Sequence, residues 1–245
     1  MSTLLDLVLD AHGGLQRWQD ARTIHAEGSI GGLLWSLRGQ EGILATTDAT
    51  VDVQQQRLVF DGFTGPALRG LFTPGRVAVE RQDGEVVAER SAPRDAFAGH
   101  GPNTPWDRLH ALYFAGYALW NYLTAPYLLT RPGVVVEELE PWRDGDGDGD
   151  ADADRRRLRA RFPQGLATHS TEQVFHYDTD GLLRRHDYAP DVLGGAPAAH
   201  FCERHVQVSG LVFPTHRFVV PVGQDGHAAS EPILITIDLT DVSVT

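Results

Sequence analysis

Residues Thr104–Thr124 read TPWDRLHALYFAGYALWNYLT, and this stretch predicts the helix around which the rest of the chain is organised. Thr104 has a side chain that caps helices, Pro105 suits the first helical position, and Asp107 stands where the acid of a capping box belongs. The sequence therefore predicts a helix that begins at Thr104.

This helix has two neighbouring faces of different chemistry at about 100° per residue. One face is aliphatic and resembles ordinary core: Leu109, Leu112, Gly116, Leu119 and Leu123. The other combines large rings with groups that need hydrogen-bond partners: Trp106, His110, Tyr113, Tyr117, Trp120, Asn121 and Thr124. Such a mixture is typical of ligand pockets, although aromatic stripes also fill cores. We expect the residues of the second face from Trp106 to Asn121 to bind a ligand, and plain core packing stays open as the alternative.

The composition excludes several classes of function. The 245 residues are 42% hydrophobic and carry a formal net charge of -12, whereas nucleic acids and anionic membrane surfaces select a basic patch. All 21 basic residues are arginines, so no lysine is present for a Schiff base or a phosphate-binding loop. The single cysteine, Cys202, allows no internal disulfide and no zinc cluster. We expect neither a metal nor a cofactor.

The N-terminus reads MSTLLDLVLDAHGG and predicts an amphipathic helix over residues 2–20, capped by Ser2 and interrupted at Gly13-Gly14. Its leucines are mixed with acids and no cationic segment precedes them, so it resembles neither a signal peptide nor a membrane span. We therefore expect a cytoplasmic protein.

The rest of the chain shows the short alternating runs of β-strands. In the first half they cover residues 23–30, 34–44, 50–56 and 57–60, and Asp83-Gly84 joins 76–81 to 85–90 as a hairpin. In the second half they cover residues 133–140, 155–162, 171–177, 182–188, 199–207, 212–220 and 233–239. We predict one α+β domain over residues 1–245. It consists of a single strongly curved antiparallel sheet of about nine to eleven strands, a half-barrel with the Thr104 helix on its concave side.

An acidic loop lies between two of these strands, with six aspartates from Asp144 to Asp154. Asp144, Asp146, Asp148 and Gly149 match the first half of an EF-hand loop. The second half does not match, because Arg155 takes the place of the bidentate glutamate. A solvated hairpin tip and a calcium site are the two interpretations, and the mismatch favours the first.

A family resemblance rests on four runs: AHGGLQRW at 11–18, FHYDTDGLLRRHDYAPDVLGG at 175–195, SGLVFPTHRFVV at 209–220 and ILITIDLTDVSV at 233–244. In this order they resemble bacterial uncharacterised proteins similar to half-barrel lipoprotein carriers of the LolA/LppX type. The resemblance implies a strongly curved sheet that encloses helices, with an apolar cavity for acyl chains between them. Those carriers are exported, whereas the N-terminus of this chain does not resemble a signal peptide, so we expect a cytoplasmic relative.

The loop Thr179-Asp180-Gly181 decides where the polar residues of one hairpin lie. A three-residue loop pairs Asp178 with Leu182 and gathers one polar set on a single face: Glu172, His176, Asp178, Arg184, His186 and Tyr188. A loop one residue longer scatters this set over both faces. If the polar face lines the cavity, Tyr188 joins the ligand-binding residues, and otherwise the face is solvated. In the next hairpin, a tight turn places Glu203 opposite His216 and His205 opposite Pro214. A carboxylate beside an imidazole can orient a general base or form an ordinary salt bridge.

Two functions remain open. The first is the binding of an apolar or amphiphilic small molecule between the curved sheet and the 104–124 helix. The second is a cofactor-independent enzyme, an isomerase, cyclase or hydrolase acting on an apolar substrate. In that enzyme His110 with Asp107, or His176 with His186, moves a proton. A cavity lined only by rings and aliphatic groups favours binding, and a buried histidine aimed into the cavity favours catalysis.

Overall fold

The computed structural model describes residues 3–142 and 155–245. The expected helix cap Ser2 and the acidic run Asp144–Asp154, with its calcium and hairpin-tip interpretations, lie outside the described residues.

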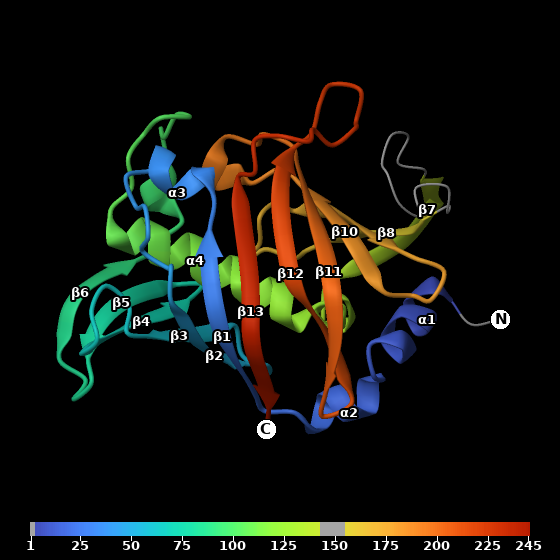
Figure 1. Cartoon of the computed structure of the whole chain (residues 1–245), viewed down its shortest axis with the longest axis horizontal. Coiled ribbons are helices and arrows are strands. Elements are labelled where there is room, and N and C mark those ends of the chain that lie inside the picture. Colours follow the sequence, from blue (N-terminus) through green and yellow to red (C-terminus); the bar gives the residue numbers. More distant parts are fainter. Residues whose placement is uncertain (1–2, 143–154) are drawn as a thin grey trace.

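One antiparallel sheet of 13 strands dominates the fold. Its spatial order is β6-β5-β4-β3-β2-β1-β13-β12-β11-β10-β9-β8-β7, so β6 and β7 are the two edges and the sheet does not close (Figure 1). The strands of the first half are β1 (Thr23–Gly31), β2 (Thr47–Asp52), β3 (Arg57–Asp61), β4 (Leu68–Thr73), β5 (Arg76–Arg81) and β6 (Val86–Ser91). Those of the second half are β7 (Val135–Trp142), β8 (Arg155–Arg161), β9 (Glu172–Tyr177), β10 (Leu183–Tyr188), β11 (Ala198–Val208), β12 (Leu211–Pro221) and β13 (Ile235–Val244). The single antiparallel sheet is confirmed, with more strands than expected.

Two short helices replace the single N-terminal helix that the sequence predicted. α1 (Leu4–Ala11) is capped by Thr3, whose hydroxyl accepts the Asp6 amide hydrogen at 3.2 Å while the Asp6 carboxylate accepts that of Thr3 at 2.9 Å. Gly13, with φ +116°, ends this helix, and α2 (Leu15–Asp20) follows. Among the described residues, no helix has the length and apolar character needed to cross a membrane.

In the first half, one predicted strand was wrong and one strand was missed. The segment expected to be a strand at 34–44 begins with a helix, α3 (Leu33–Leu37), which buries Leu34 and Trp35. β4 was not predicted, because Gly70 interrupts its apolar run. A methyl group at Gly70 would lie 2.7 Å from Leu112 Cδ1, so the glycine allows close approach of the long helix.

The long helix α4 (Arg108–Thr124) begins later than predicted, with Asp107 rather than Thr104 as its cap. It packs against β3 to β6, where Gly116 lies so close to Phe72 that an added Cβ would be 2.5 Å from the Phe72 Cβ. Near its C-terminal end, the Tyr122 ring lies 4.3 Å from that of His200 in β11. α4 thus contacts both halves of the sheet, and almost all of it is buried. Three 3₁₀ turns complete the fold: η1 (Asp95–Phe97), η2 (Tyr127–Thr130) and η3 (Asp191–Leu193).

Candidate ligand cavity

An apolar cavity of about 280 Å³ lies beside α4. The helix contributes Phe114, Ala115, Ala118, Leu119 and Tyr122. The other walls come from β1, β10, β11, β12, β13, α3 and the segment between η3 and β11. The described lining residues are all uncharged. The cavity therefore suits an apolar group and offers no counter-charge to an ion.

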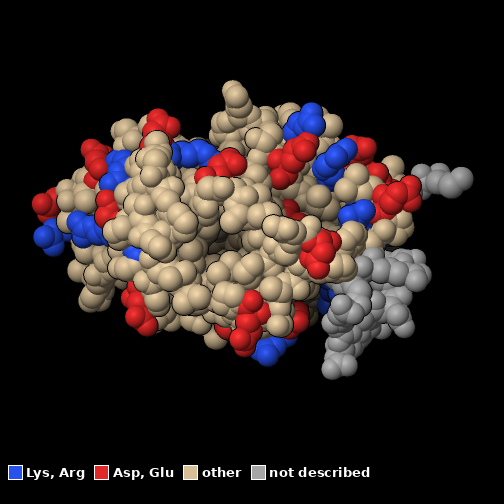
Figure 2. Space-filling view, turned by 90° about the horizontal axis from the view of Figure 1, so that it is seen from above, with Lys and Arg blue, Asp and Glu red and all other residues tan. Residues whose placement is uncertain are grey.

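The surface above these elements is also largely uncharged. Figure 2 views the molecule from the upper side of Figure 1, where α3 and the upper ends of β12 and β13 lie. Uncharged side chains cover the middle of this face around a hollow, whereas arginines and acids lie mostly towards the periphery. A ligand that approaches the cavity from this side crosses largely uncharged surface.

Three residues that the sequence selected for ligand binding lie in different places. Tyr188 lines the apolar cavity. Trp106 lies one layer behind it, with its ring 6.3 Å from Trp35 and 5.1 Å from Phe114, which both line the cavity. Tyr113 lines a second, more polar cavity of about 280 Å³ that also includes residues of the 162–168 segment. The structure thus does not bring these three together in one wall.

Two further selected residues of α4, Trp120 and Asn121, hold hydrogen bonds within the core. The Trp120 Nε1–H donates to the Asp52 and Gln55 carbonyls at 2.8 and 3.0 Å. The Asn121 amide donates to the Tyr117 and Ala167 carbonyls at 2.7 and 2.9 Å. These partners tie α4 to the loop after β2 and to the segment before β9.

The helix face that lines the cavity was not selected from the sequence. Leu119 had been assigned to plain core, while Phe114, Ala115, Ala118 and Tyr122 belonged to neither face. The signal that could have found this face is its pair of alanines, because small side chains on a buried helix leave space beside it.

Asp107 and His110 are held in structural contacts. Asp107 caps α4 by accepting the amide hydrogens of Leu109 and His110 at 2.9 Å, and the Arg90 guanidinium donates to both carboxylate oxygens at 3.2 and 2.6 Å. Burial would raise the pKa of this carboxyl, but these donors lower it to about 2. The His110 ring lies 2.9 Å from Asp107 and 3.2 Å from the Ala96 carbonyl, and it does not line the apolar cavity.

His176 and His186 lie on opposite faces of the sheet. The Asp178 amide donates to the Leu182 carbonyl at 3.1 Å, as the three-residue loop predicts. A β-bulge just before Arg185 then shifts the register, so that His176 is opposite Arg185 and His186 faces the other side. The bulge therefore divides the polar set that the sequence placed on one face.

Each of these histidines has its own partner. His176 Nε2 lies 2.9 Å from Asp187 Oδ2, and burial lowers the His176 pKa although Asp187 opposes the shift. His186 Nε2 lies 2.6 Å from Gln173 Oε1, its ring stacks on Phe175 at 4.1 Å, and burial lowers its pKa well below the usual value. Neither lines the apolar cavity.

The register predicted for the next hairpin is confirmed. Glu203 is opposite His216, and His205 is opposite Pro214. His216 Nδ1, however, lies 2.7 Å from Asp238 on β13, so this imidazole pairs with a different carboxylate.

A chain of buried hydrogen bonds ends at the cavity wall. The Tyr117 hydroxyl lies 3.2 Å from His169 Nδ1, and the Tyr122 hydroxyl lies 2.6 Å from His169 Nε2. Tyr122 is also 2.8 Å from the Tyr188 hydroxyl, and the His169 ring stacks on that of Tyr188 at 3.9 Å. His169 was missed, because it lies in a loop before β9 with no periodic pattern.

All four members of this chain are uncharged. Burial lowers the His169 pKa to about 3, and nearby Arg94 acts in the same direction. Burial also raises the pKa of each of the three tyrosines. The cavity wall therefore carries neutral hydroxyl groups at neutral pH.

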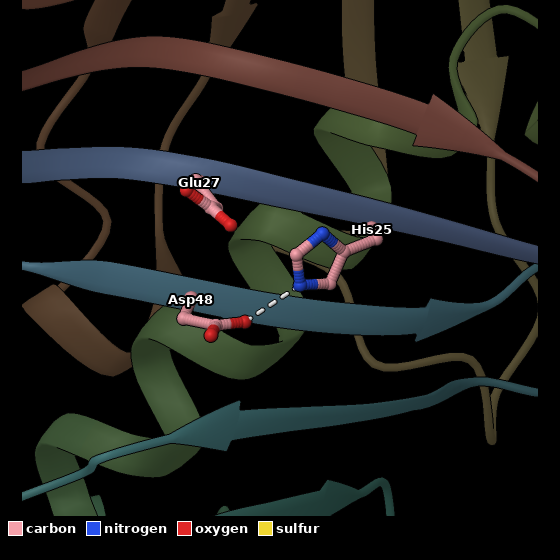
Figure 3. A group of neighbouring side chains, drawn as sticks. All are labelled: His25, Glu27 and Asp48. Atoms are coloured by element: carbon pink, nitrogen blue, oxygen red, sulfur yellow. Dashed lines mark hydrogen bonds and ion pairs between the residues drawn. The ribbon is translucent and has the colours of Figure 1, made fainter. Parts of the chain in front are cut away.

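A separate group of metal-type ligands lies on β1 and β2. His25, Glu27 and Asp48 offer one ligand atom each, all within 4.8 Å of one another, and Figure 3 shows the three side chains together. Glu27 is opposite Asp48 across the strands, a proximity that the sequence did not reveal. This donor set suits a divalent cation. The His25–Asp48 contact of 2.7 Å already joins two of the ligands directly.

No protein-family model matches the chain, and no curated protein matches its sequence. Its fold is similar to that of a DUF1329 family protein from Desulfovibrio piger, with a TM-score of 0.53 and 13% identity over 98% of this chain and 91% of that one. It is also similar to a LolA superfamily protein from Nitrosomonas europaea, with a TM-score of 0.54 and 10% identity over 100% of this chain and 94% of that one. The resemblance to LolA-type proteins that the sequence indicated is therefore confirmed for the fold.

Proposed function

We propose that this protein binds an apolar or amphiphilic small molecule in the cavity beside α4. The observation that carries the proposal is the lining, in which every described residue is uncharged and is aliphatic, aromatic or proline. Transfer of apolar ligand surface into such a site is favourable by about 25 cal/mol per Å². A charged group on the ligand would stay at the mouth, since the lining offers it no partner.

The fold supports this proposal at the level of the family. The LolA/LppX resemblance implies an apolar cavity between a curved sheet and its helices. In our proposal the sheet curves around α4, so that strands from both halves of the chain contribute to one cavity. The contacts of α4 with β3 to β6 and with His200 of β11 support this arrangement.

The enzyme alternative has less support. An isomerase, cyclase or hydrolase without a cofactor needs a group that moves a proton beside its substrate. None of the described lining residues is a histidine or a carboxylate. Asp107 is engaged as a helix cap, and His176 and His186 point to opposite faces. Binding is the function that the site supports best.

A cavity-filling substitution tests the proposal. N-phenyl-1-naphthylamine, an uncharged probe that fluoresces in apolar surroundings, should bind the wild-type protein. Ala118→Phe should weaken this binding at least about tenfold, because the new ring occupies the space that the probe needs. The affinity follows from a fluorescence titration, and the unfolding midpoint is measured alongside.

Ala67→Phe is the matched control. Ala67 is exposed and does not line the cavity, so this variant adds the same ring to the surface and should bind the probe as the wild type does. A wild-type protein that gives no fluorescence rise, or equal affinities for wild type and Ala118→Phe, contradicts the proposal.

A further inference from the structure

The hydrogen-bond chain at the cavity wall has one more hydrogen than it has bonds. Tyr117, Tyr122 and Tyr188 each bring a hydroxyl hydrogen, and the neutral ring of His169 brings one more. Three contacts join these four groups. Whichever way the chain runs, one hydrogen stays without an acceptor inside it.

The direction of the chain decides where this hydrogen lies. Tyr122 is in the middle, 2.6 Å from His169 and 2.8 Å from Tyr188, and in a chain that runs in one direction it donates in one of these contacts and accepts in the other. One direction leaves the extra hydrogen on Tyr117, which is fully buried and has no second acceptor among the described residues. The other leaves it on Tyr188, which lines the cavity. The second direction is favoured once a guest offers an acceptor, because an unpaired buried hydroxyl is costly.

We propose that the Tyr188 hydroxyl donates a hydrogen bond to an uncharged oxygen on the bound molecule, such as that of a ketone, quinone, ester or ether. This inference rests on the proposed function and assigns a polar contact inside the same cavity. His169, stacked on the Tyr188 ring at 3.9 Å, holds that ring in place and fixes the chain behind it.

The surroundings select this class of acceptor. A carboxylate placed at Tyr188 would lose its hydration without a cation in the described lining. A hydrocarbon would leave the extra hydrogen of the chain unpaired, on Tyr117 or on Tyr188. A neutral oxygen satisfies the donor and carries no charge into the cavity. The preferred ligand therefore has an apolar body with one embedded oxygen acceptor.

Benzophenone and diphenylmethane are a matched pair of probes, since they differ chiefly in a carbonyl in place of a methylene group. Wild-type protein should bind benzophenone roughly five- to tenfold more tightly than diphenylmethane, which corresponds to one neutral hydrogen bond. Tyr188→Phe should weaken benzophenone binding more than diphenylmethane binding, so that the ratio of the two affinities falls towards one. Calorimetric titration gives the affinities, and the readout is the ratio of the two affinities within each protein. The carbonyl infrared band of bound ¹³C-benzophenone should move to lower frequency in the wild type and not in the variant.

Tyr177→Phe is the control for loss of a buried hydroxyl, because Tyr177 is fully buried but does not line the cavity. It should keep both the preference and the infrared shift. A Tyr188→Phe protein that retains the ketone preference and the shifted band overturns the hydrogen bond while the binding function stands. If neither compound binds the wild type, the cavity proposal fails and this inference fails with it.

Discussion

At the scale of single residues, the buried histidines give the fold a defined pH dependence. His12 is 1% exposed, and burial lowers its pKa from 6.5 to about 4, while burial lowers that of His169 to about 3. In the unfolded chain both take up a proton near pH 6.5, before the folded protein does. The free energy of unfolding should therefore fall as the pH drops from 6.5 to 4, by roughly 1 to 2 kcal/mol for each histidine by pH 5. Urea unfolding at pH 7 and pH 5 measures this loss.

His12→Gln separates this effect from general acid sensitivity. The His12 ring bonds the Val8 carbonyl at 2.8 Å, and a glutamine amide can also donate there. The variant should be less stable at pH 7 but should lose less stability between pH 7 and pH 5. An equal loss in both proteins would show that His12 does not titrate as described.

Single residues also mark how far the sequence predicts the site. The sequence placed a capping acid at Asp107 but chose Thr104 as the cap, because both have capping side chains and only the structure shows which amides they meet. It selected Tyr188 from a polar pattern, whereas His169 became its neighbour through a contact between distant segments. Aromatic residues can be recognised in a sequence. The space beside Ala115 and Ala118, in contrast, depends on which residues of other elements face the helix there.

At the scale of elements, the contact between α4 and β4 depends on glycine. A Cβ at Gly116 would lie 2.5 Å from the Phe72 Cβ. Gly116→Ala should destabilise the protein by roughly 1 to 3 kcal/mol, although alanine favours helices by about 1 kcal/mol, because the clash forces α4 away from the sheet. Urea unfolding measures the loss.

Gly75→Ala is the control, since a Cβ at Gly75 meets no atom within 4 Å and its backbone φ does not require glycine. It should change the stability by less than about 0.5 kcal/mol. Replacing Phe72 by Leu in the Gly116→Ala background should recover part of the loss. A Gly116→Ala protein as stable as the wild type would mean that α4 and β4 are further apart than described.

The same packing explains which elements the sequence could predict. Hairpins such as β5–β6 and β11–β12 follow from alternation and turn residues, which are local signals. β4 was missed because Gly70 breaks the strand pattern. This glycine makes room for Leu112 of α4, a tertiary contact that the local sequence does not show. α3 was taken for a strand because its short run of apolar residues fits either element, and only the burial of Leu34 and Trp35 decides between them.

At the scale of the whole molecule, one pairing of distant strands joins the two halves. β1 pairs with β13, so that His25 is opposite Ser243 and Ile24 is opposite Val244. The sequence predicted hairpin neighbours and a single antiparallel sheet. No sequence pattern in β1 or β13 indicates that these two strands pair. The full order of 13 strands therefore comes from the structure alone. It also leaves β6 and β7 as open edges, which need protection from pairing with other molecules.

Charge on β7 provides this protection on one side. Val135 is 65% exposed, and Glu137 and Glu138 follow it, each bonded to an arginine of β8 at 2.6 Å. Replacing both glutamates with valine would create a long apolar strand at an unpaired edge, which should drive self-association. Light scattering and size-exclusion chromatography over a range of concentrations should detect it.

The matched control replaces Glu27 and Glu203 with valine. Both are exposed, but they lie on β1 and β11, which are inner strands of the sheet order. Glu27 pairs with β2 and β13, and Glu203 pairs with β12. This control gains the same apolar surface away from the two edge strands, so it should stay as soluble as the wild type. If the two double variants associate equally, apolar exposure alone is responsible. If only the β7 variant associates, the glutamates keep an open sheet of this size from extending into its neighbours.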